Sequence, residues 1–405
     1  MDIEKGPWAT GYSWVSPMNY FDEARKGFTL PKNVVFHDAT LRDGEQTPGV
    51  VLRREDKIEI AKMLDEVGVD RIEAGMPAVS EEDFEAIKSI AKLGLNAKIM
   101  GFCRAVRGDI DLNVKAGTWG VLIETPAGYL RIRNQYRWTE EEAIRRSLDG
   151  IRYARSQGQY VVFFPFDATR ADVNFLERML ATVYNEARPD AVALVDTTGS
   201  AMPQAITYLT NMYKSIMKDL PVEIHTHNDL GMATANELAA IAAGAEVVHV
   251  CINGLGERCG NAALDEVAMA LQILYGYRLS LKFDKFQELS RLAARLPGMK
   301  VPLSKPVSGT YAFGREVGLG MDMIKAAPLT VFPYLPEFVG QKPTVILGKK
   351  SGNLSIKFKL EQMGLDATDD QVKRMVDDVK NTAIRNKGPV SDEQFTVIYK
   401  AATAE

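Results

Sequence analysis

Two histidines, His225 and His227, are the residues of this sequence whose spacing most directly indicates chemistry. They lie in the run Val222–Asp229, which is predicted to be a short strand that gives way to polar residues. Side chains two positions apart on a strand point to the same side. Two imidazoles at a strand end therefore form half of a divalent-metal site, or else a pair of buried, hydrogen-bonded histidines. The spacing alone leaves both interpretations open.

The chain that must position this pair has 405 residues, more than one hydrophobic core usually serves, so we expect one large and one smaller domain. The net charge of −4 argues against nucleic acid as a partner. No apolar run approaches the roughly 20 residues that span a bilayer, and the N-terminus lacks the features of a signal peptide. Three cysteines are too few for a disulfide framework, so we expect a reduced, cytoplasmic protein without a membrane partner.

Short apolar runs alternate along the chain with stretches whose apolar residues recur at helical spacing. Continuously apolar runs are typical of parallel strands that are buried on both faces. Eight such units over about 250 residues predict an α/β fold of the TIM (β/α)8 barrel type. An open doubly wound sheet is the alternative, but no Gly-rich phosphate loop follows the first run. The predicted strands are Val34–His37, Arg71–Met76, Lys98–Cys103, Gly120–Glu124, Tyr160–Pro165, Ala191–Asp196, Val222–His225 and Val247–Ile252.

The pattern divides the chain into four parts, which are an N-terminal arm over residues 1–33, the barrel over 34–280, a post-barrel helix and linker over 281–347, and a small α-helical subdomain over 348–405. The arm has too little periodicity to fold alone and is expected to pack on the main body or on a partner subunit. The linker is rich in proline and glycine. Helices are predicted after it at Asn353–Met363, Asp369–Asn386 and Ser391–Ala401.

Polar residues gather where the predicted strands end, and TIM barrels carry their active sites on that face. A ligand set of imidazoles, carboxylates and an amide, with open positions, suits catalytic Mg²⁺, Mn²⁺, Zn²⁺ or Co²⁺. Such a metal polarises a substrate carbonyl, and an arginine beside it stabilises the oxyanion of carbon–carbon bond making or breaking. The polar residues at these ends include Arg42, Asp43, Glu73, Glu124, Asp167, Asp196, His225, His227 and Asn261.

Three motifs in order, Leu41–Gln46, His225–Ala233 and Gly254–Asn261, resemble those of the metal-dependent TIM-barrel acyltransferases and lyases. This family includes the 2-isopropylmalate, homocitrate and citramalate synthases and, more distantly, hydroxymethylglutaryl-CoA lyase. The run Gly348–Gly352 also resembles a motif in the first small subdomain of the synthases, with Lys350 in place of histidine. The resemblance implies a Claisen-type enzyme that condenses acetyl-CoA, or a related acyl-CoA, with a 2-oxo acid, and it implies a homodimer.

Residue roles follow from the resemblance, motif by motif. Arg42 would act as the electrophilic catalyst on the carbonyl oxygen. Thr197 falls where the family holds the substrate carboxylate, although a structural role in a turn is also open. Gln46 would line the pocket or support it. The implied metal ligands are Asp43, His225 and His227, with Asn261 at or next to the metal.

Two departures from the family put the proton-transfer step in question. Phe166 stands where the synthases usually carry a glutamate, and a phenyl ring cannot accept a hydrogen bond as a carboxylate does. In the segment Ala312–Gly320, Arg315 and Gly320 stand where the synthases carry histidines, and no histidine follows His249. A general base with a pKa near neutrality is therefore missing from its expected place.

Other groups are candidates for the missing base, and they leave the reaction direction open. Glu316, Glu257 or Tyr311 would take the proton, while Arg315 would bind an additional anionic group. Alternatively, the protein is a metal-dependent lyase or aldolase that cleaves a 3-hydroxy acid or an acyl-CoA. A non-catalytic relative is disfavoured, because the metal ligands are retained.

Overall fold

The computed structural model describes residues 3–404 and divides the chain into two compact units. One unit is Met18–Val301, and the other combines Met1–Pro17 with Pro302–Glu405. Within the described residues, no helix is both long enough and apolar enough to cross a membrane.

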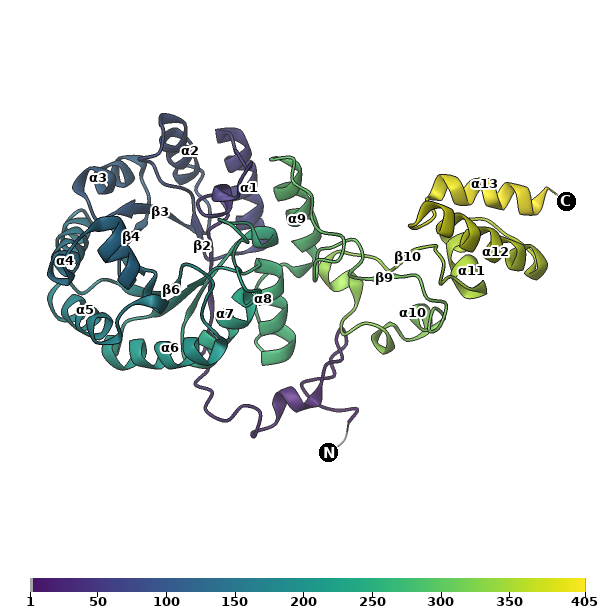
Figure 1. The fold of residues 1–405 in the computed structure, drawn as a ribbon, viewed down its shortest axis with the longest axis horizontal. Helices are drawn as coiled ribbons and strands as arrows, with labels where there is room; N and C mark the ends of the chain where they lie inside the picture. The colour runs from purple at the N-terminus through teal and green to yellow at the C-terminus, as the bar shows by residue number, and fades with distance from the viewer. Residues whose placement is uncertain (1–2, 405) are drawn as a thin grey trace. The chain divides into compact units, whose positions relative to one another are not determined.

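The larger unit is a closed barrel of eight parallel strands in chain order, in which β1 pairs with both β2 and β8. Helices α1 to α8 form a ring around these strands (Figure 1). This architecture confirms the predicted TIM barrel. The strands are β1 Val35–Asp38, β2 Arg71–Glu73, β3 Lys98–Arg104, β4 Gly120–Pro126, β5 Tyr160–Phe166, β6 Ala191–Asp196, β7 Val222–Thr226 and β8 Val247–Val250.

The helices of the barrel have the caps and periodicity that the sequence indicates. Helix α1, for example, ends at Gly68, whose φ of 97° is left-handed and therefore suits glycine. Helix α4 begins after Thr139, whose hydroxyl accepts a hydrogen bond from the Glu142 amide. The helices are α1 Arg54–Val67, α2 Glu81–Ala91, α3 Arg107–Ala116, α4 Glu140–Ser156, α5 Val173–Glu186, α6 Pro203–Met217, α7 Ala233–Ala242, α8 Leu264–Ala270 and α9 Phe286–Arg295.

Strand β6 has the predicted bounds, and the other seven strands differ from the predictions by one to three residues at their ends. The largest difference lies in β2 and has a local cause. We predicted a strand over Arg71–Met76, but β2 ends at Glu73. Gly75 has a φ of 141°, which takes the chain out of the extended conformation directly after the strand. The chain turns here at the rim of the barrel, so that Gly75 and Met76 line the central cavity.

A buried network of charged residues crosses the interior of the barrel beside its apolar core. Glu73 of β2 accepts hydrogen bonds from Arg42 at 2.5 Å and from His37 of β1 at 3.0 Å. The His37 ring stacks on His249 of β8 with ring centroids 4.2 Å apart. Burial lowers the pKa of His37 to about 4, so this imidazole is neutral at neutral pH.

The network continues from His249 to Glu223 of β7, at 2.7 Å, and from Glu223 to Arg71 of β2, also at 2.7 Å. Replacing Glu223 with leucine is expected to destabilise the barrel by about 3–5 kcal/mol, because it leaves the buried Arg71 guanidinium without its partner. Urea unfolding followed by circular dichroism measures this loss. The double change Glu223→Leu with Arg71→Met should recover part of the stability, and a loss of less than about 1 kcal/mol for Glu223→Leu alone would contradict the prediction.

The second unit joins the described N-terminal residues to the C-terminal part of the chain. Ser13 forms a bridge with Tyr334, and the Trp14 amide donates to the Pro333 carbonyl at 2.9 Å. A small α-helical subdomain ends the chain, as predicted. The elements of this unit are β9 Gly314–Arg315, α10 Met323–Ala326, β10 Thr344–Val345, α11 Asn353–Gln362, α12 Asp369–Asn386 and α13 Asp392–Thr403.

Candidate active site

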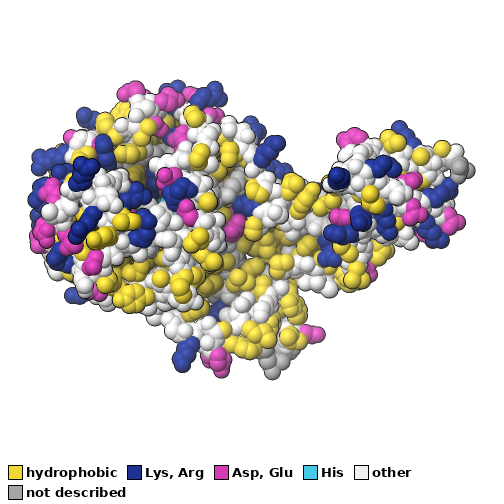
Figure 2. Space-filling model, in the orientation of Figure 1, with side chains coloured by type: hydrophobic (Ala, Val, Ile, Leu, Met, Phe, Trp, Pro, Cys, Tyr) yellow, Lys and Arg dark blue, Asp and Glu magenta, His cyan; other side chains and the backbone are white. Residues whose placement is uncertain are grey.

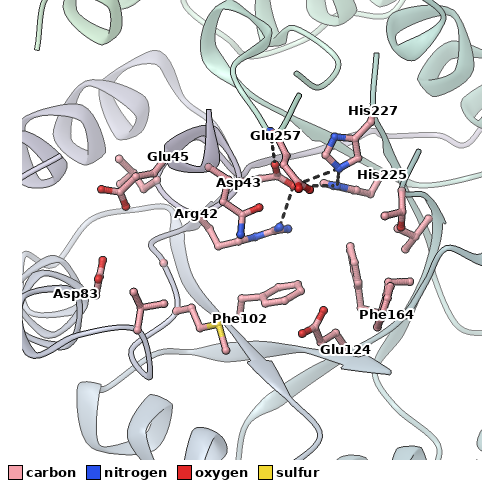
Figure 3. Close-up of a pocket in the computed structure, with 18 of the residues that line it drawn as sticks. Arg42, Asp43, Glu45, Asp83, Phe102, Glu124, Phe164, His225, His227 and Glu257 are labelled. Carbon is pink, nitrogen blue, oxygen red and sulfur yellow. Dashed lines mark hydrogen bonds and ion pairs between the residues drawn. The ribbon is translucent and has the colours of Figure 1, made fainter. Parts of the chain in front are cut away.

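Three of the four predicted metal ligands converge at the carboxyl end of the barrel (Figure 3). Asp43 lies in the loop after β1, His225 lies on β7, and His227 directly follows β7. The Asp43 Oδ2 atom is 3.3 Å from His225 Nε2 and 3.6 Å from His227 Nε2. The two imidazole Nε2 atoms are 3.4 Å apart. The three ligand atoms therefore surround one point, as a single cation would require.

The electrostatics of this cluster suit a divalent cation. Burial lowers the pKa of His225 to about 3 and lowers that of His227, so both imidazoles are neutral at neutral pH. Burial opposes ionisation of Asp43, but Arg42 and the two imidazoles hold the pKa of its carboxyl well below the usual range. Two neutral imidazoles and one carboxylate are the protonation states that metal binding needs. The residues present therefore fit the cation.

Asn261, the fourth predicted ligand, lies beside His227, with which it forms an isolated bridge. Its amide nitrogen donates to the Leu255 carbonyl at 3.1 Å. Its Oδ1 atom is buried without a hydrogen-bond partner among residues 3–404. An unsatisfied buried oxygen is costly, so this atom is available to a cation or to a water bound to one.

Arg42 is buried and held in a fixed orientation at the edge of the cluster. Its Nε donates to Glu73 Oε1 at 2.5 Å and its Nη1 to Asp43 Oδ2 at 2.9 Å. Its guanidinium also lies 4.2 Å from the centroid of the Phe102 ring. Burial opposes its charge, but the Glu73 and Asp43 carboxylates raise the pKa of Arg42, so the guanidinium stays protonated.

These groups line one side of a cavity of about 520 Å³ at the centre of the barrel. Figure 2 shows this face of the barrel hollowed at its centre, with charged side chains bordering the hollow. Gln46, which we predicted to line the pocket or support it, lies in the cavity wall. Thr197, for which we left substrate binding and a structural role in a turn open, also lies there. The Thr197 Oγ1 atom accepts a hydrogen bond from the Asp167 amide at 2.7 Å, which leaves its own hydroxyl hydrogen free to donate. The apolar part of the wall consists of Leu41, Met76, Val79, Phe102, Phe164, Phe166 and Val195.

The other predicted site residues do not all lie in the barrel unit. Glu257 lines the cavity, but its carboxylate pairs with Arg258 at 2.9 Å. Tyr311, Arg315 and Glu316 belong to the second unit. There the Arg315 Nη2 atom donates to the Leu319 carbonyl, and Glu316 Oε1 accepts from the Lys350 amide, both at 2.9 Å. Their roles in catalysis remain predictions.

Two features of the barrel were not assigned a role from the sequence. One is Glu124 of β4, which the sequence placed only among the polar strand ends and which proves to line the cavity. The other is a second group of potential ligand atoms, on His37, Glu223 and His249, within 4.8 Å of one another. The carboxylates of this network already pair with Arg42 and Arg71, so the charge is balanced without a cation.

Comparison with known proteins agrees with this architecture. Residues 33–293 match the HMGL-like family, and residues 307–387 match the family described as homocitrate synthase post-HMGL domain-like. The fold of the barrel is also that of HMG-CoA lyase from Bacillus subtilis, with a TM-score of 0.60, 19% identity, and coverage of 67% of this chain and 96% of the lyase.

Several curated relatives match most of the chain, and two of them serve as examples. Homocitrate synthase AksA from Methanothermobacter thermautotrophicus is 41% identical over 96% of this chain and 97% of its own length. The probable 2-isopropylmalate synthase from Methanopyrus kandleri is 44% identical over 88% of this chain and 71% of its own. The chain is accordingly an enzyme of the acyltransferase, condensing type. It belongs to the HMGL-like family of TIM-barrel enzymes.

Proposed function

We propose that the protein condenses acetyl-CoA, or a related acyl-CoA, with a 2-oxo acid in a reaction that depends on a divalent cation. The observation that carries this proposal is the convergence of the three ligand atoms of Asp43, His225 and His227 beside a buried, protonated Arg42. A cation and a guanidinium on one side of the central cavity are the groups that stabilise negative charge on a carbonyl oxygen.

Each polar group of the site has a role in this reaction. Asp43, His225 and His227, with Asn261 beside them, would hold Mg²⁺, Mn²⁺, Zn²⁺ or Co²⁺. The cation would supply Lewis acidity toward the 2-oxo acid. The free hydroxyl hydrogen of Thr197 would donate to the substrate carboxylate.

The wall of the cavity favours a 2-oxo acid whose remaining chain is small and apolar. Met76, Phe102, Phe164 and Phe166 present hydrocarbon to the cavity, and removing such surface from water favours binding of an apolar group by about 25 cal/mol per Å². Arg131 also lines the cavity, and its guanidinium stays near Asp167 at 3.7 Å. A dicarboxylic acceptor would have to compete with Asp167 for this arginine.

We propose that three residues of the second unit take part in the reaction and that the protein is a homodimer. Arg315 would bind an anionic group of the acyl-CoA or of the acceptor, because a guanidinium binds carboxylate and phosphate well. Tyr311 and Glu316 are candidates for proton transfer. Sedimentation of the purified protein tests the homodimer.

A lyase or aldolase is the second candidate. It is favoured because every histidine is paired with a buried carboxylate. Each histidine of the chain lies within hydrogen-bonding or ion-pairing reach of a buried carboxylate, so none of them is free to act as a base at neutral pH. A lyase requires different proton transfer from a synthase, while it uses the same cation and arginine.

One assay separates the two candidates. The protein is incubated with Mn²⁺ or Mg²⁺, acetyl-CoA and, in turn, pyruvate, 3-methyl-2-oxobutanoate and 2-oxoglutarate, and free thiol is followed. We expect thiol release with pyruvate or 3-methyl-2-oxobutanoate above that with 2-oxoglutarate, because of the apolar wall. Absence of thiol with every acceptor would refute the synthase, and cleavage of a 3-hydroxy acid or its CoA thioester would support the lyase.

A further inference from the structure

Condensation of a thioester with a 2-oxo acid begins with removal of a proton from carbon, which needs a base whose pKa lies near neutrality. Histidine usually serves, but the histidines of this barrel are already engaged with buried carboxylates. The pairs are His37 with Glu73, His249 with Glu223, and His225 and His227 with Asp43. The base must therefore be sought among the other titratable groups of the cavity wall.

Most carboxylates of the cavity wall are held by cations. Glu45 and Asp83 both bind the Lys57 ammonium, at 2.5 Å and 2.6 Å. Asp43 pairs with Arg42, and Glu257 pairs with Arg258. Within residues 3–404, Glu124 is the carboxylate of this wall whose side chain has no ion pair or hydrogen bond. Its oxygens are thus free for a substrate.

Strand β4 directs this side chain into the barrel. Thr125 faces outward, where its hydroxyl lies 2.8 Å from the Ser147 hydroxyl on α4, so its neighbour Glu124 faces inward. In the register of the barrel, Glu124 stands beside Phe164 of β5. Figure 3 shows the Glu124 carboxyl between Phe102 and Phe164, directed into the open space across from Arg42 and Asp43. A substrate that contacts Arg42 from this cavity would meet the carboxyl on its other side.

The surroundings of Glu124 bring the pKa of its carboxyl close to neutrality, where a catalytic base works. Burial among aromatic rings raises the pKa of Glu124 to about 7, against the attraction of Arg42 and Arg104. The neighbouring strand β5 contributes the uncharged Phe164 and Phe166. The titratable and charged groups that face Glu124 from the surrounding elements are Arg42, Glu73, Arg104, Asp109, Arg131 and Tyr136.

We propose that Glu124 is the catalytic base that takes a proton from the carbon adjacent to the thioester carbonyl, an inference that rests on the proposed condensation. A carboxylate oxygen of Glu124 forms the new O–H bond. The electron pair of the broken C–H bond becomes the C=C bond of the enolate, and the carbonyl π pair moves to oxygen.

The enolate carbon then attacks C2 of the 2-oxo acid, which forms the carbon–carbon bond and moves the C2=O π pair to oxygen. That alkoxide, next to Arg42, takes the proton that Glu124 carries, and the carboxylate is regenerated. Water finally attacks the thioester carbonyl, so that a C–O bond forms and the C–S bond breaks. The thiolate takes one proton from the water, and the other proton goes to solvent.

The change Glu124→Gln tests this role, because glutamine keeps the size and polarity but cannot accept the proton at neutral pH. We expect kcat to fall by about 100- to 10,000-fold with metal content and acceptor KM little changed. Glu124→Asp should restore part of the rate. Glu141→Gln, at an exposed glutamate of α4, is the matched control and should keep the wild-type rate.

The pH dependence of kcat/KM distinguishes a catalytic base from a residue that only supports the structure. The active form is the carboxylate, so wild-type kcat/KM should rise with pH, level off above about pH 7, and fall about tenfold per pH unit below it. The Glu124→Gln variant should not show this fall of kcat/KM below pH 7.

A second experiment follows the exchange of solvent deuterium into the methyl group of acetyl-CoA in D₂O, with oxalate as an acceptor mimic that cannot condense. The exchange should be fast in the wild type and lost in Glu124→Gln.

The wild-type assay separates failure of the proposed function from failure of this role. A wild type that releases no thiol with any acceptor refutes both. An active wild type, with a Glu124→Gln variant that keeps its rate, its fall of kcat/KM below pH 7 and its methyl exchange, refutes only the role of Glu124. Loss of rate with retained methyl exchange also refutes it, because the proton would then be removed by another group.

Discussion

Replacing His227 with alanine is expected to remove the bound metal and to lower kcat by about 1,000-fold or more. The change leaves Asp43 and His225 as a two-residue site and opens the cluster to water. Loss of a residue that only supports a ligand costs about 10- to 100-fold in metal affinity, and loss of a ligand costs more. Lewis-acid stabilisation is worth several kcal/mol, which corresponds to the expected loss of rate.

The measurement pairs metal content after gel filtration, by mass spectrometry, with thiol release in the presence of excess Mn²⁺. His249→Gln is the matched control, because His249 is a buried histidine of the same barrel that bonds to Glu223 and not to Asp43. This control should retain the metal. A His227→Ala protein with wild-type metal content and rate would contradict the assignment of the site.

The barrel and the convergence of Asp43, His225 and His227 could be predicted because both depend on local features of the sequence. Eight apolar runs at regular intervals leave few alternatives to a closed parallel barrel. His225 and His227 are two positions apart on one strand, and Asp43 follows another strand at the same end. Such residues meet wherever the carboxyl ends of the strands form one rim. The end of β2 could not be placed in the same way, because it depends on the backbone conformation of Gly75.

The buried charge network could not be predicted, because it depends on which side chains face one another across the barrel. Arg71 and Glu223 are 152 positions apart, and His37 meets Glu73 from a neighbouring strand. The role of Glu124 also depends on its surroundings. An acid at the end of an apolar strand is a usable signal in the sequence. That no ion pair within residues 3–404 holds this carboxylate, although Arg42 and Arg104 are near enough to attract it, is known only from the fold.

Arg42→Lys should lower kcat by about 100- to 1,000-fold and leave the acceptor KM nearly unchanged, because a guanidinium in this position acts mainly on the charge that develops during the reaction. Three of its N–H donors bond to Glu73 and Asp43. A guanidinium has five such donors, so two remain for an oxyanion after these three are used. A lysine ammonium has three donors in all, and it cannot satisfy both carboxylates while it also contacts the substrate.

The change Glu73→Gln tests how far the rate depends on the orientation of the Arg42 guanidinium, because the positive charge itself stays in place. It keeps Arg42 but removes the carboxylate that receives Nε at 2.5 Å, so the guanidinium loses part of its support. We expect an intermediate loss, about 10- to 100-fold in kcat, with the metal retained. Single-turnover thiol release measures both variants. If Arg42→Lys lost acceptor binding and not turnover, the arginine would be a substrate anchor, and the charge on the alkoxide would have to be stabilised by the groups around Asp43 alone.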